Sequence, residues 1–314
     1  MKTANRDKLP ALVALDWGTS SLRAYLLDGS GRAIESAREP RGIMQVETGG
    51  FATVFDEIAG AWLQRHPGLP AIAAGMVGSV QGWVETPYLP CPASPGDLAG
   101  ALVQAPGRQL WIVPGVRQPG DRPDVMRGEE TQIAGALALR PELSADARIV
   151  LPGTHSKWAR VSAGRIASFT TYMTGELFAV LRDHSILGRA AGSDAGRDGD
   201  SVFLRGVDAA RGADGIAPLL FSARALVLTG GIAPADALDY LSGLLIGDEL
   251  RSALTEPGDA PRLIGEPALC TRYARALARF GFDGAEAIPD AAVAGLWSIA
   301  TAAGIVRTTK TEVA

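Results

Sequence analysis

The sequence predicts an α/β fold made of two domains that share one structural plan. Three observations lead to this prediction. The chain has 314 residues, enough for two domains of about 150 residues each. Short apolar runs alternate with amphipathic segments, as in layered α/β proteins. A strand, a glycine-containing turn and a second strand occur in that order twice, within residues 12–28 and 149–171. We expect the two turns to face a shared cleft.

The first turn has the residue types that a magnesium–nucleotide site needs. Leu12 to Leu15 fit a buried strand, and the alternation in residues 21–28 fits an antiparallel partner. The Asp16 carboxylate between them can hold a hydrated divalent cation, and Gly18 lets the backbone approach a phosphate. An ordinary hairpin turn with polar residues is the alternative. The candidate phosphate-binding residues here are Gly18, Thr19, Ser20 and Arg23, with Asp16 as the candidate metal ligand.

The elements that follow alternate as an α/β plan requires. Apolar residues at helical spacing predict an amphipathic helix within residues 49–66. Short apolar strands are expected at residues 71–76 and 109–113. Proline and glycine are frequent in residues 85–107, which we interpret as loop or edge structure, and residues 114–123 are expected to be flexible.

A pair of carboxylates begins the next predicted helix, which ends near residue 139. The segment reads Arg127-Gly-Glu-Glu-Thr-Gln132, and acidic residues at a helix start are favoured by the helix dipole. A kinase also needs a carboxylate that accepts the proton of the attacking hydroxyl. We favour Glu129 as this base over Glu130, and Glu130 is instead a candidate for binding the substrate. Arg127 is the candidate partner for a substrate carboxylate, with a salt bridge to one of the glutamates as the alternative.

The second turn repeats the plan of the first. The strand Ile149-Val-Leu151 leads into Pro152-Gly-Thr-His-Ser-Lys157, and further strands are expected at residues 158–161 and 165–171. Gly153 and Thr154 offer amides and a hydroxyl to a phosphate, and Lys157 adds a positive charge. A structural turn with a surface lysine is the alternative. The remaining predicted elements are helices at 175–184, 201–214, 235–252, 268–280 and 290–303, and a strand at 261–265.

Composition and motif searches exclude several classes of protein. The net charge of −4 argues against a general nucleic-acid binder, and no apolar run approaches the length of a membrane span. The polar N-terminus fits no signal peptide. Cys91 and Cys270 match no metal or redox spacing, so the cytoplasm is the expected location. Neither a P-loop nor a GxGxxG motif is present.

Taken together, these segments resemble the 2-dehydro-3-deoxygalactonokinase family of the actin-like sugar-kinase superfamily. The segments are Asp16-Trp-Gly-Thr19, Ala74-Gly-Met-Val-Gly-Ser79, Val125-Met-Arg-Gly-Glu-Glu-Thr-Gln132, Pro152-Gly-Thr-His-Ser-Lys-Trp158, Met173-Thr-Gly-Glu-Leu177, His184-Ser-Ile-Leu-Gly188 and Leu241-Ser-Gly-Leu-Leu-Ile-Gly247. The resemblance implies two actin-like (ribonuclease H-like) domains with an interdomain cleft. It also implies ATP- and Mg²⁺-dependent phosphorylation of the 6-hydroxyl of 2-dehydro-3-deoxy-D-galactonate in D-galactonate breakdown.

The resemblance also assigns parts of the chain. Domain I would comprise residues 1–147 plus 290–314, and domain II residues 148–289. Residues 72–79 and 292–296 resemble the two interdomain connections, where small-residue helices would cross. Gly265 lies where the adenosine motif is expected, in preference to the Gly230–Gly231 pair. The Gly128-Glu-Glu-Thr segment resembles the Gly-Asp-Gln-Gln segment of carbohydrate kinases, with Glu129 in place of the catalytic aspartate.

Other functions stay open from the sequence alone. The chain could phosphorylate another small sugar acid or an amino sugar, or it could be a non-catalytic ATP-driven switch. The gluco and galacto epimers of the substrate differ at one hydroxyl, which the sequence does not resolve. Expected partners are ATP and a small sugar acid, without nucleic acid or membrane. A homodimer is one option for the oligomeric state.

Overall fold

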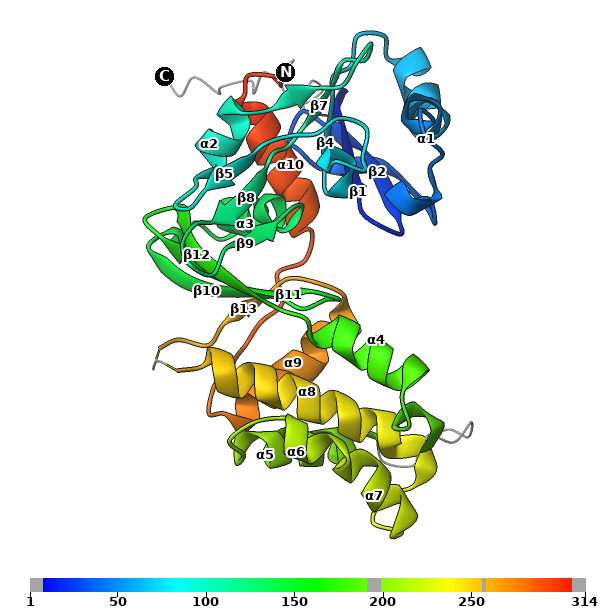
Figure 1. The fold of residues 1–314 in the computed structure, drawn as a ribbon. Coiled ribbons are helices and arrows are strands. Elements are labelled where there is room, and N and C mark those ends of the chain that lie inside the picture. Colours follow the sequence, from blue (N-terminus) through cyan, green and yellow to red (C-terminus); the bar gives the residue numbers. More distant parts are fainter. Residues whose placement is uncertain (1–7, 191–198, 256–257, 307–314) are drawn as a thin grey trace. The chain divides into compact units, whose positions relative to one another are not determined.

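The computed structural model describes residues 8–190, 199–255 and 258–306 (Figure 1). The chain forms two compact units. Unit 1 comprises Met1–Asp146, Arg160–Phe169 and Asp290–Ala314, and unit 2 comprises Ala147–Ala159 and Thr170–Pro289. The grouping of residues 160–169 with unit 1 was not expected from the sequence. Among the described residues, no helix is long and apolar enough to cross a membrane.

A six-stranded sheet with the order β3-β2-β1-β4-β7-β6 forms the centre of unit 1. β1 pairs antiparallel with β2 and parallel with β4. The apolar residues predicted to form a strand at 12–15 are fully buried in β1. The strands are β1 (Pro10–Trp17), β2 (Leu22–Asp28), β3 (Ala33–Glu39), β4 (Ala71–Ala74), β6 (Val103–Gln104) and β7 (Leu110–Ile112).

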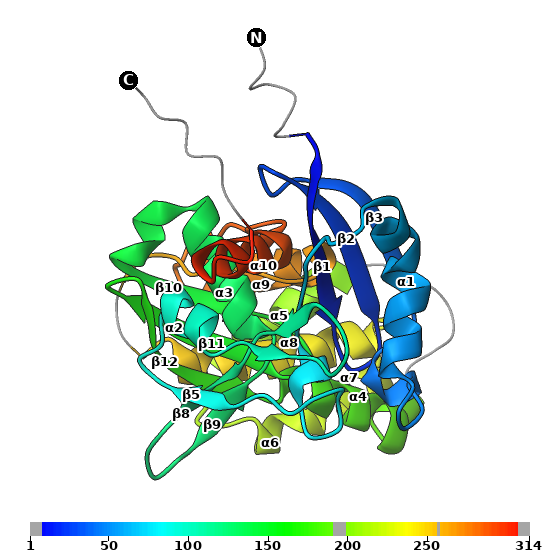
Figure 2. The same cartoon turned by 90° about the horizontal axis from the view of Figure 1, so that it is seen from above.

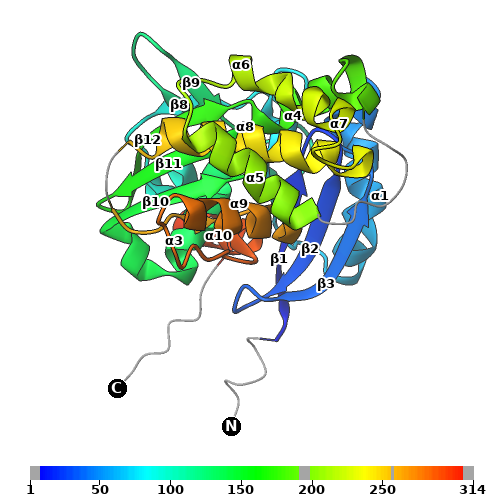
Figure 3. The same cartoon turned by 90° about the horizontal axis from the view of Figure 1, so that it is seen from below.

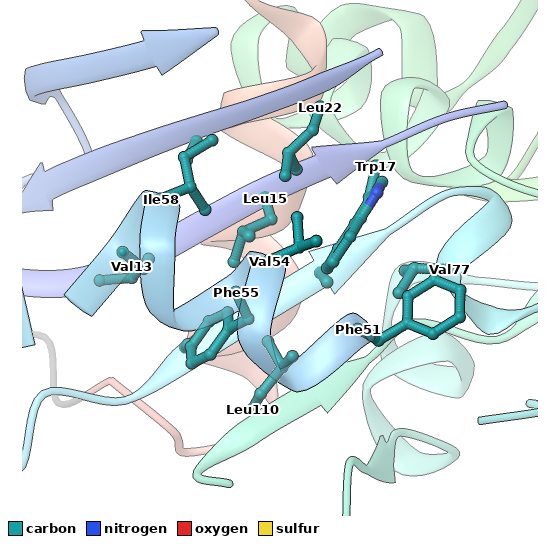
Figure 4. Close-up of a cluster of buried hydrophobic side chains, with 14 of the residues drawn as sticks. Val13, Leu15, Trp17, Leu22, Phe51, Val54, Phe55, Ile58, Val77 and Leu110 are labelled. Carbon is teal, nitrogen blue, oxygen red and sulfur yellow. The ribbon is translucent and has the colours of Figure 1, made fainter. Parts of the chain in front are cut away.

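One face of this sheet is covered by helix α1 (Phe51–Arg65), which lies along β2 and β3 (Figure 2). Figure 4 shows the core between them, where Val13, Leu15 and Trp17 of β1 meet Phe51 and Phe55 of α1. Because successive side chains on a strand point to opposite faces, Asp16 lies on the other face of the sheet.

Two small-residue helices cross closely in unit 1. α3 (Glu129–Leu139) and α10 (Ala291–Ala302) meet where a Cβ at Gly135 would lie 1.8 Å from Ala291 O, and a Cβ at Gly295 equally close to Thr131 O. The expected partner of the last helix was residues 72–79, and this expectation was wrong. Residues 76–78 form only a short 3₁₀ turn, η2, and the preceding Gly75 adopts a positive φ of 98°.

Several short elements of unit 1 were missed. β5 (Tyr88–Pro90), β8 (Gly115–Gln118) and β9 (Asp124–Met126) form a three-stranded sheet, so residues 114–123 contain a strand rather than a wholly flexible segment. Helix α2 (Pro95–Gly100) lies within the predicted loop at 85–107 and begins with a capping box between Ser94 and Asp97. Strands of three or four residues carry too little alternation to be read from a sequence. The remaining unit 1 elements are the 3₁₀ turns η1 (Ile43–Gln45) and η3 (Pro141–Ser144).

The second sheet repeats the strand order of the first. Its order is β12-β11-β10-β13, which corresponds to β3-β2-β1-β4, and β10 pairs parallel with β13 as β1 does with β4. The predicted fold class, α/β with two actin-like units on one plan, is confirmed. The strands are β10 (Asp146–Leu151), β11 (Ser156–Ser162), β12 (Arg165–Tyr172) and β13 (Arg262–Leu263).

Helices make up most of the rest of unit 2. α5 and α8 lie side by side (Figure 3), packed through Gly206, Gly243 and Gly247, where added Cβ atoms would clash. The helices are α4 (Thr174–His184), α5 (Gly199–Arg211), α6 (Ala217–Leu220), α7 (Ser222–Leu228), α8 (Ala237–Ala253) and α9 (Pro267–Arg279), with 3₁₀ turns η4 (Gly188–Ala190) and η5 (Pro234–Asp236).

Candidate active site

The first glycine turn joins β1 to β2 and is held by backbone contacts. The Gly18 N–H donates to Ser21 O at 2.9 Å, and the Ile43 N–H of η1 donates to Gly18 O at 3.0 Å. A Cβ at Gly42 would lie 2.2 Å from Thr19 O, whereas a Cβ at Gly18 would meet only Ser21 O, at 3.7 Å. Thr19 and Ser20 are exposed. Gly42 therefore packs against the backbone of the turn and supports it, whereas the space beside Gly18 is free of other atoms of the described residues.

Asp16 lies near the end of β1, directly before this turn. Its side chain is 23% exposed, and Arg23 Nη1 of β2 lies 3.6 Å from its Oδ2 atom. Burial raises the pKa of Asp16, and the nearby Arg23 guanidinium opposes that rise. In the described part of the chain, no cluster of three metal-ligating side chains is present. One carboxylate is nevertheless compatible with Mg²⁺, which keeps several waters and is completed by substrate phosphates.

The start of α3 lies close to the end of β1 in the same unit. A Cβ at Gly75 would lie 2.8 Å from Trp17 O, and a Cβ at Gly128 would lie 3.2 Å from Gly75 Cα. Gly75 and Gly128 both have a positive φ, a conformation that glycine adopts without strain. These close approaches bring Asp16 and Glu129 into one neighbourhood.

The two glutamates of α3 have different environments. Glu129 is half-buried, and its Oε2 accepts a hydrogen bond from the Arg127 N–H at 3.0 Å. Glu130 is 0% exposed, and its carboxyl accepts from the Gly128 N–H at 2.7 Å and from Thr131 Oγ1 at 2.9 Å. Burial, with a smaller contribution from the Glu129 charge, raises the pKa of Glu130 to about 8. Of the two, Glu129 has the exposure that contact with a substrate requires.

Arg127 is buried, and its guanidinium contacts residues around β5. Nη2 donates to Thr86 O at 2.9 Å, Nη1 donates to Thr86 Oγ1, and Nε donates to Tyr88 OH at 3.3 Å. The guanidinium also lies over the Tyr88 ring, 4.2 Å from its centroid. These contacts orient Arg127 toward the three-stranded sheet of unit 1, a structural role that the sequence did not suggest.

The second glycine turn, between β10 and β11, is braced by the first turn of α4. The Glu176 N–H donates to Thr154 O at 3.0 Å, and His155 Nε2 lies 2.5 Å from Glu176 Oε2. A Cβ at Gly175 would lie 2.4 Å from Gly153 O, whereas a Cβ at Gly153 would meet nothing within 4 Å. As in unit 1, a glycine elsewhere in the unit supports the turn, and the turn's own glycine is open.

Lys157 does not lie on the surface. It is buried in β11, and its Nζ donates to Thr171 Oγ1 of β12 at 2.7 Å. The alternative of a surface lysine is therefore wrong. Because Ser156 and Trp158 bond to residues of α9 and α8, alternation along β11 directs Lys157 to the opposite face of the sheet.

A cavity of about 260 Å³ in unit 2 ends at the second turn. Gly153 forms part of its wall, together with α4, α8 and α9. At its polar edge, Arg272 Nη1 pairs with Asp239 Oδ1 at 2.8 Å, and the Arg272 guanidinium lies over Phe203. The other lining residues are Thr174, Gly175, Phe178, Leu238, Ser242, Leu245, Ile246, Leu269 and Tyr273.

Gly265 lies beside this cavity without lining it. It connects β13 to α9, and a Cβ there would lie 3.2 Å from Pro152 O and 3.5 Å from Cys270 Sγ. The residues that do line the cavity from this side, Leu269, Arg272 and Tyr273, follow on α9. The Gly230–Gly231 pair follows α7 and is also absent from the described lining.

Comparison with known proteins identifies the family. The sequence pattern of the 2-keto-3-deoxy-galactonokinase family matches residues 16–299. This chain belongs to that family. A Rhizobium meliloti (strain 1021) protein named "Probable 2-dehydro-3-deoxygalactonokinase DgoK1" is 41% identical to this family member over 299 residues, covering 92% of this chain and 96% of the relative. The 2-dehydro-3-deoxygalactonokinase of Escherichia coli (strain K12) is 36% identical over 294 residues, covering 92% and 97%.

A solved structure agrees with this membership. The crystal structure of a candidate 2-dehydro-3-deoxygalactonokinase from Sinorhizobium meliloti superposes with a TM-score of 0.86 at 38% identity, covering 93% of this chain and 98% of that one. This member of the 2-keto-3-deoxy-galactonokinase family is a carbohydrate kinase, and it has the fold of that structure.

Sequence reasoning found both turns of this kinase but missed the cavity beside the second one. The cavity-lining residues of α8 lie within or next to Leu241–Gly247, a segment that carried the family resemblance without an assigned role. Their helical spacing was a usable signal, because Leu238, Ser242 and Leu245 recur on one helix face.

Proposed function

We propose that this chain catalyses transfer of the γ-phosphoryl group of ATP to the 6-hydroxyl of 2-dehydro-3-deoxy-D-galactonate, a step of D-galactonate catabolism. Family membership and the names of the two relatives support the substrate. The observation that carries the nucleotide assignment is the cavity that ends at Gly153. Two features favour a reducing cytoplasm as the location. The proposed reaction requires ATP, and the two cysteines, Cys91 and Cys270, are free thiols.

The cavity in unit 2 is proposed to hold the adenosine part of ATP. Nucleoside sites are concave and mostly apolar, with a few polar groups that set orientation. Phe178, Leu245 and Ile246 supply apolar walls, and the Asp239–Arg272 pair supplies the polar edge. This assignment moves the adenosine site from Gly265 itself to the face of α9 that follows it.

Both glycine turns are proposed to bind phosphate groups through their own backbone amides. Gly18, Thr19 and Ser20 act in unit 1, and Gly153 with Thr154 in unit 2. The lack of any close protein neighbour to a Cβ at Gly18 or Gly153 supports this proposal, since a phosphate needs that space. Arg23 is proposed to assist phosphate binding at the first turn. Lys157 is proposed to add positive charge for phosphate binding at the second turn, from the face of β11 on which it lies.

Asp16 is proposed to hold Mg²⁺ through water. Its partial exposure at the end of β1, next to the hydroxyls of Thr19 and Ser20, fits a cation that is only partly coordinated by protein. The bound ion would neutralise charge on the transferring phosphoryl group. The Arg23 guanidinium, which opposes the rise in the pKa of Asp16, favours the charged carboxylate that a cation needs.

Glu129 is proposed to orient the sugar-acid hydroxyl and accept its proton. The hydrogen bond from the Arg127 N–H holds the Glu129 carboxylate in place, and a base must be positioned in this way. Glu130 and Arg127 were candidates for direct substrate contact. Their burial and their contacts within unit 1 favour supporting roles, in which they shape the start of α3.

The test of this function is a coupled ADP-release assay with ATP, Mg²⁺ and a panel of 2-keto-3-deoxy sugar acids. ADP release is expected to depend on the sugar acid and to be fastest with 2-dehydro-3-deoxy-D-galactonate. A faster gluco epimer would change the substrate and leave the kinase assignment intact. ADP release without any sugar acid would instead indicate the ATP-driven switch.

The base assignment needs its own variant. Glu129→Gln keeps the shape of the side chain and removes its basicity, so kcat is expected to fall by about a hundredfold to ten-thousandfold. ATP binding, measured by isothermal titration calorimetry, is expected to be retained. A Glu129→Gln enzyme with a near-normal kcat would remove Glu129 as the base.

A further inference from the structure

One buried carboxyl group in unit 2 connects two segments that carry the family resemblance with helix α9. Glu249 of α8 is 2% exposed and lies just beyond Leu241–Gly247. Trp158 Nε1, at the end of the second turn's segment, donates to Glu249 Oε1 at 2.7 Å. Thr174 Oγ1, from the start of α4, donates to Glu249 Oε2, and so does Tyr273 OH of α9, at 2.7 Å.

These hydrogen bonds satisfy a group that is costly to bury. A carboxylate removed from water must be compensated by donors, and here β11, α4 and α9 each supply one. Burial raises the pKa of Glu249, and the hydrogen bonds to its carboxyl oppose that rise. Ser156 Oγ extends the cluster through Tyr273 OH at 3.2 Å. A connected polar cluster of this kind fixes the relative positions of the elements that form it.

Two of the three donors belong to the wall of the cavity. Thr174 and Tyr273 line it, whereas Glu249 and Trp158 are not among its described lining residues. Thr174 also begins the helix whose next residue, Gly175, packs against Gly153 O, and whose Glu176 N–H donates to Thr154 O. A single hydrogen bond therefore separates the Glu249 carboxyl from both the cavity wall and the segment that braces the second turn.

We propose that Glu249 is a positioning residue for ATP. Its carboxyl holds Thr174 and Tyr273 so that the cavity and the adjoining Gly153 turn keep the shape that receives the nucleotide. Glu249 acts through these residues and does not itself touch the ligand. This inference rests on the proposed function, in which the unit 2 cavity takes adenosine.

The test compares MgATP binding by the full-length wild-type protein and three variants, using isothermal titration calorimetry. Glu249→Leu removes the acceptor that three donors share and is expected to weaken MgATP binding by about tenfold or more, since the loss of one buried hydrogen-bond partner costs about that factor. Glu249→Gln is expected to stay within about threefold of wild type. Its amide can accept from Trp158 and donate to the two hydroxyls, which can each act as acceptors.

Trp158→Phe is the decisive variant, because Trp158 donates to Glu249 and is not among the described residues that line the cavity. It removes one donor to the carboxyl and is expected to weaken MgATP binding several-fold. Because Glu249→Leu leaves buried groups unpaired and can fail to fold, the milder Trp158→Phe keeps the inference testable. In steady-state kinetics the KM for ATP is expected to rise in this variant, with the KM for the sugar acid unchanged.

Gly247→Ala is the matched control on the same helix. A Cβ at Gly247 would lie 2.9 Å from both Ala210 Cβ and Val207 O, on the face of α8 that packs against α5. This variant is expected to lower the midpoint of thermal unfolding and to leave MgATP affinity unchanged. Loss of affinity that merely follows loss of stability would appear in this control as well.

The outcomes separate the inference from the function on which it rests. Wild-type protein that binds MgATP, with Trp158→Phe binding equally well, overturns the positioning role alone. An equal loss of affinity in Gly247→Ala does the same. Wild-type protein that does not bind MgATP overturns both the positioning role and the proposed kinase function.

Discussion

The two glycine turns follow one backbone plan but differ in what surrounds them. Each joins the first two strands of its sheet, and each is braced by a second glycine, Gly42 in unit 1 and Gly175 in unit 2. The first turn follows a partly exposed carboxylate, Asp16. The second is followed by a buried lysine, Lys157, and adjoins a cavity. The shared features are those that the proposed phosphate binding requires, and the differences separate the turn proposed to serve the metal from the turn proposed to serve the nucleoside.

The largest expected effect concerns the acid that only the first turn has. Asp16→Asn keeps the side-chain shape and removes the charge that would attract Mg²⁺, so kcat is expected to fall by about a thousandfold. The measurement is kcat at increasing Mg²⁺ concentration. Partial recovery at high Mg²⁺ would support the metal role, and a wild-type kcat would show that the two turns do not differ in this way.

Replacement of the bracing glycines tests the feature that the turns share. Gly42→Ala and Gly175→Ala each place a methyl group against the backbone of a turn. Both are expected to lower the free energy of unfolding, by about 2 kcal/mol or more, and to impair ATP turnover. Urea denaturation and steady-state kinetics measure the two effects.

Each bracing glycine has a control in its own unit. A Cβ at Gly60 of α1, or at Gly215 before α6, would meet nothing within 4 Å. Alanine at these positions is expected to leave both stability and turnover near wild type. If Gly42→Ala or Gly175→Ala behaved like its control, the corresponding turn would not depend on its brace.

The glycines of the turns themselves are expected to behave differently. Neither Gly18 nor Gly153 has a close protein neighbour or a positive φ, so alanine should leave the unfolding midpoint unchanged. If phosphates bind at both turns, Gly18→Ala and Gly153→Ala are each expected to raise the KM for ATP by about tenfold, because each variant loses about one good contact to a phosphate. An increase in only one variant would assign the phosphates to that turn alone.

The smallest expected effect is a pH dependence behind the first turn. In the folded protein the pKa of Glu130 is raised from 4.5 to about 8, so folding favours the protonated acid. Its contribution to stability is complete below pH 4.5 and is lost as the pH rises through about 8. Relative to Glu130→Gln, the wild-type unfolding temperature is therefore expected to fall by a few degrees between pH 5 and 8.5. This fall corresponds to a loss of about 1 kcal/mol or more in the free energy of unfolding.

Differential scanning calorimetry of both proteins across this pH range measures the effect. Glu249→Gln, which alters the buried acid behind the second turn, provides the parallel series for unit 2. A constant difference between wild type and Glu130→Gln would mean that Glu130 titrates as it does in the unfolded chain.

The sequence predicted what local patterns encode and missed what depends on distant contacts. The glycine turns and the long helices follow from strand and helix periodicity, and both were found. Glu129 and Glu130 are neighbours on a helix and so face different directions, but only the packing of α3 decides that Glu130 is the buried one. The sequence left a surface Lys157 open as the alternative, because its partner Thr171 lies on another strand.

The missed features share this dependence on tertiary packing. Gly42 and Gly175 contact turns that lie about twenty residues earlier in the chain, and no local sequence pattern identifies these two glycines. The proposed role of the Glu249 carboxyl depends on hydrogen-bond donors from three other elements, which the local sequence does not indicate. The catalytic and metal roles of Glu129 and Asp16 stay predictions that the proposed variants test.

The close crossing of α3 and α10 has a consequence for biosynthesis. Unit 1 is discontinuous along the chain: α3 leaves the ribosome early, whereas α10 follows only after residues 140–290 have been made. A methyl group at Gly135 of α3 would clash with α10, so the two helices are in direct contact there. This part of α3 is therefore covered by a helix that is synthesised late. All of unit 2 is therefore synthesised before the last helix of unit 1, and the close packing on α3 can be completed only after that point.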